Sequence, residues 1–140
     1  MNRIQPYLFF GGRCEEALAF YRDALGAQID MLLRFDQSPE PVPAGVLQPG
    51  FEHKVMHAAL RIGETQILAS DGCDDGARFC GFSLALSVPT AAEADRVFAA
   101  LAEGGKVGMP LGKTFFSPRY GMLTDRFGVG WMVMVPATPN

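Results

Sequence analysis

The chain has 140 residues, of which 49% are hydrophobic and only 19% carry a charged side chain. This length allows one compact domain, or two small halves that share a core. The net charge of −3 and the scattered positions of the 12 basic residues argue against nucleic-acid binding, which needs clustered positive charge. No stretch approaches the roughly 20 apolar residues that a membrane-spanning helix requires.

The low share of charged residues indicates that part of the surface is covered, most simply by a second copy of the chain, so we expect a homodimer. Residues 1–6 lack the apolar core of a signal peptide. Cys14, Cys73 and Cys80 are odd in number and show no C-x-x-C spacing, which predicts free thiols and a cytoplasmic protein. A disulfide between Cys73 and Cys80 is the alternative.

The first half of the chain is predicted to form one strand, one helix and three further strands. An apolar run predicts a strand over 4–10, and apolar residues at helical spacing from Ala17 to Ala24 then predict a helix. Gly26 ends this helix, since glycine readily adopts the left-handed cap conformation. The further strands are expected over 29–35, 54–62 and 65–70.

Residues 36–51 contain four prolines and two glycines, a density of breakers that no helix or strand tolerates. Connections of this length are uncommon in compact domains unless they act as lids or lack a fixed structure. The segment is therefore either a mobile flap over a binding site or a surface insert.

The second half repeats the order of elements. Residues 82–88 alternate between apolar and small side chains, which is the period of a strand. Thr90 and Glu93 have the spacing of a capping box at the start of a helix. The remaining elements are a helical stripe over 94–101 and strands around 107, over 116–124 and over 131–135. Asp125 and Arg126 are expected to brace the turn before the last strand.

The order of elements predicts an α+β protein of two βαβββ modules, residues 1–72 and 80–136, within one domain over 1–140. Each module has one helix and a mixed, curved sheet. A single helix leaves one sheet face uncovered, so the two modules are expected to combine and enclose it.

Three segments carry a family pattern. The first comprises Pro6-Tyr7-Leu8, Phe10-Gly11, Glu16-Ala17, Phe20-Tyr21 and Leu25-Gly26. The second comprises His57-Ala58, Leu60, Ile62-Gly63-Glu64 and Ser70-Asp71. The third and most specific comprises Tyr120-Gly121, Asp125-Arg126-Phe127-Gly128 and Trp131. Together they resemble the PhnB-like branch of the vicinal-oxygen-chelate superfamily, which includes glyoxalases, bleomycin-resistance proteins and dihydroxybiphenyl dioxygenases.

The resemblance implies two modules that face each other around a pocket, built jointly by the two copies of a homodimer. Members with known chemistry bind a divalent metal there through His and Glu. By register, those ligand positions are occupied here by Pro6 (or its neighbour Gln5), His57 (or Ala59), Ser83 and Met132. Because proline, serine and methionine are not a set that holds a hard metal, we predict no metal and no cofactor.

The predicted pocket is apolar and rich in methionine, with a few polar groups. Strand alternation turns Ser83 and Met132 toward it and turns Phe82 and Trp131 toward the helices. The ligand-binding candidates are Tyr7, Arg61, Ser83, Phe116, Tyr120, Met132 and Met134. His57 is the candidate catalytic residue, because histidine titrates near neutral pH and this one faces the cavity. The alternative is a hydrogen-bonded structural histidine.

These observations favour a metal-independent protein that binds a small apolar or aromatic molecule. The alternative is an enzyme of the glyoxalase or dioxygenase type that uses His57 as a base or holds a divalent metal weakly. A third interpretation is a structural role with a vestigial pocket. Nothing resembles the glycine-rich turn of a methyl-donor site, so a methyltransferase is not indicated. The expected partners are a second copy and a small ligand, with neither nucleic acid nor membrane.

Overall fold

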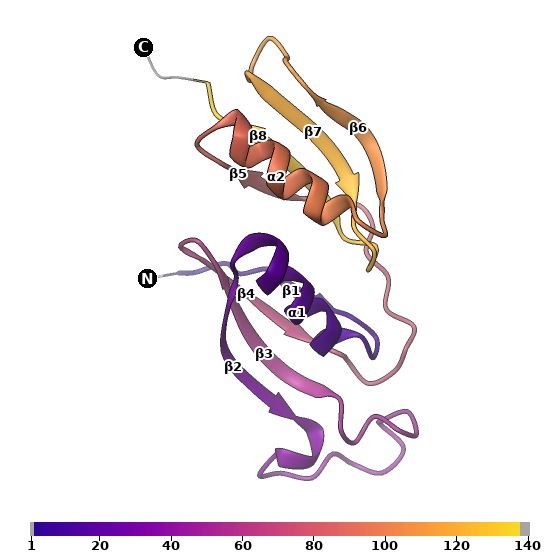
Figure 1. The fold of residues 1–140 in the computed structure, drawn as a ribbon. Helices are drawn as coiled ribbons and strands as arrows, with labels where there is room; N and C mark the ends of the chain where they lie inside the picture. The colour runs from indigo at the N-terminus through magenta and orange to yellow at the C-terminus, as the bar shows by residue number, and fades with distance from the viewer. Residues whose placement is uncertain (1, 138–140) are drawn as a thin grey trace. The chain divides into compact units, whose positions relative to one another are not determined.

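The computed structural model describes residues 2–137 and divides the chain into two units, Met1–Arg78 and Phe79–Asn140. We call these units module one and module two (Figure 1). Each contains a strand, a helix and three further strands in that order. The predicted α+β class and the two βαβββ modules are therefore confirmed.

Module one places one helix against a four-stranded mixed sheet (Figure 1). Its elements are β1 (Tyr7–Phe9), α1 (Cys14–Leu25), β2 (Gln28–Arg34), the 3-10 helix η1 (Phe35–Gln37), β3 (Val55–Ile62) and β4 (Thr65–Ser70). The strand order is β1-β4-β3-β2, with β1 parallel to β4 and the other pairs antiparallel. The first strand is shorter than the predicted 4–10, because only Tyr7–Phe9 pairs with β4.

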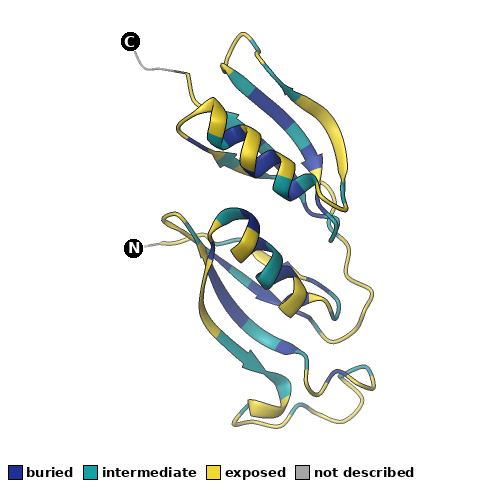
Figure 2. Ribbon diagram, viewed as in Figure 1, coloured by how far each residue is buried: buried dark blue, intermediate teal, exposed yellow. Residues whose placement is uncertain are grey.

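Helix α1 forms as the sequence predicts. Its apolar stripe, which includes Ala17 and Tyr21, is buried, and Gly26 ends it in the left-handed conformation at φ 68°. Ala58 and Leu60 of β3 are buried as well. Buried residues concentrate on the central strands and on one side of each helix (Figure 2). The other face of the module one sheet is left without a helix.

Module two repeats the plan with a second four-stranded sheet. Its elements are β5 (Leu84–Ser87), α2 (Ala91–Ala102), β6 (Lys106–Gly112), β7 (Arg119–Thr124) and β8 (Gly130–Val135), in the order β5-β8-β7-β6. Helix α2 packs closely on β7, where a Cβ at Gly121 would lie 2.9 Å from the Phe98 ring. At its N-terminus, the Thr90 hydroxyl accepts the Glu93 N–H at 3.1 Å. The Glu93 carboxylate pairs with Arg96, so only half of the expected capping box is present.

Three details of module two differ from the prediction. Strand β7 begins at Arg119 rather than at Phe116, because Thr114 and Ser117 close a hydrogen-bonded turn that takes Phe116 out of the sheet. Phe82 does not pack against the helix layer; it precedes β5 and is 47% exposed. The strand expected around residue 107 extends over all of β6.

The proline-rich segment 36–51 is held against module one by hydrogen bonds. Asp36 N–H donates to the Glu52 carbonyl at 2.9 Å, and Gln48 N–H donates to the Cys73 carbonyl at 2.8 Å. The Gln48 side chain also accepts the Asp75 N–H at 3.1 Å. The segment therefore has a defined resting structure, while its opening as a flap stays a prediction.

The three cysteines are free thiols, as predicted: Cys14 is buried, and Cys73 and Cys80 are exposed. Of the helices within residues 2–137, none has the length and apolar character needed to cross a membrane.

Candidate functional site on the open face of module one

The sheet face of module one that lies opposite α1 carries a row of apolar side chains, and we call it the open face. Strand pairing places Tyr7, Leu68, Ala59 and Met31 side by side across all four strands. Tyr7 is 40% exposed and Met31 is 43% exposed. Leu68 is half-buried and Ala59 is buried between them, so the exposed apolar area of this row lies at its two ends, a partly exposed apolar surface of the kind that binding sites use.

Three rings form an aromatic row at one end of this face. Tyr7 and Phe9 stack with ring centroids 4.9 Å apart and planes inclined by 17°. The His57 ring also contacts Tyr7, with centroids 5.6 Å apart and planes inclined by 45°. Phe9 and Tyr7 project to the same side because they are two residues apart on β1.

Tyr7 and His57 share a hydrogen bond, with Tyr7 Oη 2.8 Å from His57 Nδ1. Burial, and secondarily the nearby Cys14 thiol, raises the pKa of Tyr7 above its ordinary value, so the phenol stays protonated at neutral pH. If the phenol donates to Nδ1, the proton of neutral His57 is on Nε2; if Nδ1–H donates to the phenol, Nε2 is a free acceptor. The structure thus brings together two of the residues predicted for the site.

Arg61, another predicted ligand-binding residue, lies at the opposite end of the open face in a polar network. Its guanidinium donates to Gln28 Oε1 at 2.6 Å and to Asp30 Oδ1 at 3.2 Å. Asp30 lies on this face because it is two residues from Gln28, the partner of Arg61, and the register shift between Ile29 and Met31 adds Met31 to the same face. The Arg61 charge is therefore paired within the protein.

A hollow of about 450 Å³ lies beside the aromatic row. Phe9 contributes one wall, and the segment after β4 contributes the others through Asp71, Gly72, Cys73, Asp74, Gly76, Ala77 and Arg78. Gly72 adopts φ 72°, and a Cβ there would lie 3.5 Å from the Phe9 ring. Volumes of roughly 300–1,000 Å³ are usual for small-molecule sites.

Asp71, at the wall of this hollow, has a structural role that the sequence did not reveal. Its side chain accepts the N–H groups of Gly12, Cys14 and Val55, each at 2.8 Å. The residue is only 1% exposed. It thereby joins the start of α1 to the start of β3 and fixes the strand that carries His57. In the sequence, Asp71 stood out only as an acidic residue directly after a strand and as part of the family segment Ser70-Asp71, and neither feature indicated which groups it binds.

The open face of module two has a different composition. Met132 and Met134 of β8 lie on the side opposite α2, as predicted, and strand pairing sets Met122 and Tyr120 beside them. Tyr120 is only 8% exposed, and the Phe116 ring packs on its edge with centroids 5.0 Å apart.

Ser83, the remaining predicted ligand-binding residue, lies just before β5 rather than on it. It is exposed, and its hydroxyl oxygen would lie 2.8 Å from a Cβ at Gly130. The structure places Ser83 beside the start of β8, away from the methionines at the centre of this face.

Asp125 braces the turn before β8 through backbone groups. Its carboxylate accepts the N–H groups of Phe127 at 2.9 Å and Val129 at 3.0 Å, together with the indole N–H of Trp131 at 2.9 Å. Arg126 donates to the Glu103 carbonyl at 3.2 Å. These contacts give the Asp125 segment a structural function in module two.

The positions that the family resemblance assigns to metal ligands do not fit a hard divalent cation. Pro6 has no side-chain donor, and its carbonyl accepts the Leu68 N–H at 2.9 Å. Met132 offers a thioether, which is a soft ligand. Within residues 2–137, no group of three or more His, Cys, Asp and Glu side chains lies together in a way that could hold a metal ion. We therefore derive no chemical step through a metal.

The family model of the Glyoxalase/Bleomycin resistance protein/Dioxygenase superfamily matches residues 3–133. Protein YjdN of Escherichia coli K12 is 36% identical, with 94% of each chain covered. The crystal structure of protein PA1353 from Pseudomonas aeruginosa is 43% identical with a TM-score of 0.84, covering 97% of this chain and 98% of that one. A PhnB protein from Bacillus cereus, described as a putative 3-demethylubiquinone-9 3-methyltransferase, is 30% identical with a TM-score of 0.80, covering 96% and 99%.

Proposed function

The chain belongs to the glyoxalase/bleomycin resistance protein/dioxygenase superfamily, as a PhnB- and YjdN-like member, and we propose that it binds a small, largely aromatic molecule on the open face of module one. The observation that carries this proposal is the exposed aromatic row of Phe9, Tyr7 and His57, joined by the Tyr7–His57 hydrogen bond. Binding in this proposal does not depend on a metal.

The chemistry of the row sets the kind of ligand. A flat ring can stack on Tyr7 and Phe9, while a polar substituent reaches His57 Nε2, the ring nitrogen that Tyr7 does not occupy. Apolar groups can then lie on Leu68 and Met31, which are half-buried and exposed members of the same row. The proposed ligand is therefore an aromatic molecule with one hydrogen-bonding group, whose remaining surface is apolar.

The test compares 2-naphthol, which has a hydroxyl, with naphthalene, which has none, by NMR titration. Tyr7→Leu is expected to weaken the binding of both probes roughly three- to tenfold, because an aromatic stacking partner is lost. His57→Leu is expected to weaken 2-naphthol binding and to leave naphthalene binding unchanged.

Phe115→Leu is the matched control, because it removes a ring that is fully exposed at 101% and lies in module two. It should leave both affinities unchanged. If Tyr7→Leu has no larger effect than Phe115→Leu, or if neither probe binds, the proposal is wrong.

The Tyr7–His57 hydrogen bond also favours a second candidate, in which His57 acts as a general base. This requires Nδ1–H to donate to Tyr7 Oη, which leaves the Nε2 lone pair free to take a proton. The ¹⁵N chemical shifts of the imidazole at neutral pH distinguish the two tautomers. A free-acceptor shift at Nε2 supports the base, and a protonated Nε2 contradicts it.

A further inference from the structure

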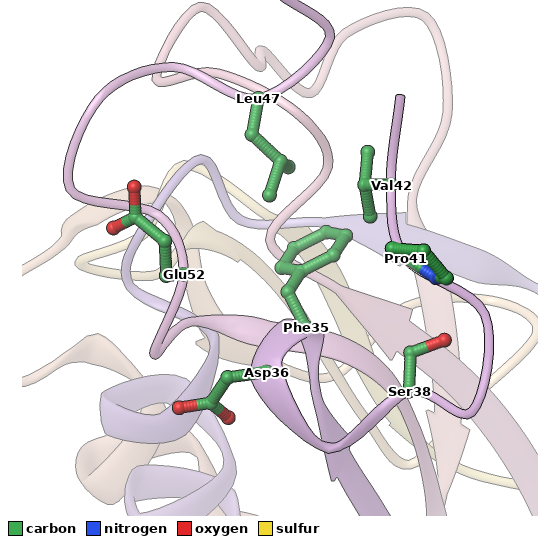
Figure 3. A pocket seen from close by; sticks show the side chains of 7 residues that line it. All are labelled: Phe35, Asp36, Ser38, Pro41, Val42, Leu47 and Glu52. Carbon is green, nitrogen blue, oxygen red and sulfur yellow. The ribbon is translucent and has the colours of Figure 1, made fainter. Parts of the chain in front are cut away.

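The proline-rich segment of module one and the residues that flank it line a separate, open hollow of about 320 Å³, which shares no lining residue with the open-face row or the aromatic row. Its walls are formed by Phe35, Asp36, Ser38, Pro41, Val42, Leu47 and Glu52 (Figure 3). The Phe35 ring lies at the centre and points toward Leu47, with Asp36 and Glu52 on one side and Val42 on the other (Figure 3).

Hydrogen bonds within the segment and to the loop after β4 hold the walls of this hollow, since Gln48, next to Leu47, is bonded to Cys73 and Asp75. Phe35 begins the 3-10 helix η1, and its N–H donates to the Lys54 carbonyl at 3.1 Å. The next N–H, that of Asp36, donates to the Glu52 carbonyl, so the two ends of the segment are tied together. Prolines between them restrict the backbone, which lowers the entropy cost of holding a binding site ready.

The charge at the hollow is negative. Asp36 Oδ2 lies 2.6 Å from His53 Nδ1. Within the described part of the chain, the Glu52 carboxylate is exposed and has neither an ion-pair nor a hydrogen-bond partner. The neighbouring cations are engaged elsewhere: Arg34 pairs with Glu15 at 2.7 Å, and Lys54 donates to the Gly12 carbonyl at 2.9 Å.

We propose that this hollow binds a small organic cation with an apolar body, such as a quaternary ammonium. The cationic head would lie against the Phe35 ring face and beside Glu52, since aromatic faces and carboxylates both attract positive charge. Apolar groups of the ligand would contact Val42 and Leu47. The volume holds about ten water-sized groups, which limits the ligand to a small molecule.

The proposal is independent of ligand binding at the open face, and one NMR titration separates the two. Choline chloride is the cationic probe, 3,3-dimethylbutan-1-ol is its neutral isostere, and sodium chloride controls for ionic strength. Choline is expected to shift and saturate amide signals within residues 35–52 and to leave those of Tyr7 and His57 in place. The neutral alcohol should bind at least roughly threefold more weakly, because it lacks the charge.

Glu52→Gln is the decisive variant, because it removes the unpaired charge while keeping the backbone carbonyl that Asp36 uses. It is expected to weaken choline binding roughly two- to fivefold. Glu64→Gln, at an exposed position in the turn between β3 and β4, is the matched control and should have no effect. Phe35→Leu should also weaken binding, with thermal unfolding used to confirm that the variant is folded.

Equal affinity for choline and the alcohol would overturn the proposal. So would an unchanged affinity in Glu52→Gln, or choline-induced shifts at the aromatic row instead of at residues 35–52. If Phe35→Leu does not fold, the comparison of Glu52→Gln with Glu64→Gln still decides the outcome.

Discussion

The two modules share one order of elements but differ in where they place polar chemistry. On the open face of module one, Tyr7 and His57 form an accessible hydrogen-bonded pair within an aromatic row. On the corresponding face of module two, Met132 and Met134 supply thioethers, and the neighbouring Tyr120 is buried. The βαβββ plan thus leaves one sheet face of each module without a helix, and the side chains on that face determine what it can bind.

The modules also differ in how a buried carboxylate supports them. Asp71 and Asp125 are 1% and 3% exposed, and each accepts three N–H donors. Asp71 connects segments far apart in the sequence, from Gly12 to Val55. Asp125 connects residues of one turn to Trp131. Asp71 therefore stabilises the contact between distant segments that support the candidate site, whereas Asp125 stabilises one local turn.

The largest expected difference is in the reactivity of the three cysteine thiols. Burial, followed by the negative charges of Asp71 and Glu15, raises the pKa of Cys14 well above its ordinary value, and its side chain is fully buried. Cys73 and Cys80 are exposed. A thiol reagent at pH 8 should therefore modify these two rapidly and Cys14 at least about a hundredfold more slowly, because Cys14 must await an opening of module one.

Counting modified thiols by mass spectrometry checks this expectation. In denaturant, Cys14 should react as fast as the other two thiols. Equal rates at all three cysteines would show that module one opens far more readily than its hydrogen bonds indicate. No rapid modification at all would indicate a disulfide between Cys73 and Cys80.

Asp71→Ala is expected to lower the free energy of unfolding by about 3 kcal/mol, since it removes the acceptor of two buried backbone N–H groups, those of Cys14 and Val55, and of the partly buried N–H of Gly12. Urea unfolding followed by circular dichroism measures the loss. Asp75→Ala is the control, because Asp75 is exposed in the same loop and only its backbone is hydrogen-bonded to Gln48. A loss no larger than that of the control would refute the role assigned to Asp71.

Trp131→Phe tests the corresponding carboxylate in module two. It is expected to lower the free energy of unfolding by about 2 kcal/mol. The substitution keeps a ring in the core but leaves Asp125 Oδ2 without its indole donor. Urea unfolding and amide hydrogen exchange are the measurements, and exchange should rise first in the turn at Phe127 and Val129. An unchanged stability would show that the indole N–H contributes nothing net.

The smallest change in stability is expected when either of two surface ion pairs is removed. These pairs are Glu15–Arg34 in module one and Glu93–Arg96 in module two. The hydrogen bond from arginine lowers the pKa of each glutamate in the folded chain. Each pair therefore stabilises the fold above the ordinary glutamate pKa, and this contribution is lost as the pH falls through the lowered folded value.

Glu15→Gln and Glu93→Gln, compared by urea unfolding at pH 7 and pH 3, test this contribution. We expect a small destabilisation at pH 7 that disappears at pH 3, with the larger change in Glu15→Gln because that pair joins α1 to β2. An effect that persists at pH 3 would mean that charge is not its cause.

Much of the fold could be predicted because it depends on local patterns. Helical spacing located α1 and Gly26 located its end, and strand alternation placed Met132 and Met134 on one face and Trp131 on the other. The same alternation placed His57 on the open face. Tyr7 could not be paired with His57 from the sequence alone, because their contact depends on the parallel pairing of β1 with β4.

What the sequence did not reveal depends on contacts between distant segments. The role of Asp71 requires knowing that residues 12, 14 and 55 meet at one point. The hollow around Phe35 is lined by a segment that the sequence predicted to be a flap or a surface insert, and its walls depend on contacts that the prolines did not indicate. The displacement of Phe116 from β7 follows from a turn between Thr114 and Ser117. The homodimer, the shared pocket and the cytoplasmic location stay predictions.

The most direct test of ligand binding by module one is a titration of ¹³C-methyl methionine signals with 2-naphthol. Met31 lies on the open face of module one, and Met56 neighbours His57 on β3, where alternation turns it to the opposite face. Met132 and Met134 report on module two. We predict a saturable shift of Met31 that Tyr7→Leu weakens, with Met56 unchanged. A shift confined to Met132 and Met134, or no shift of Met31, would contradict the account.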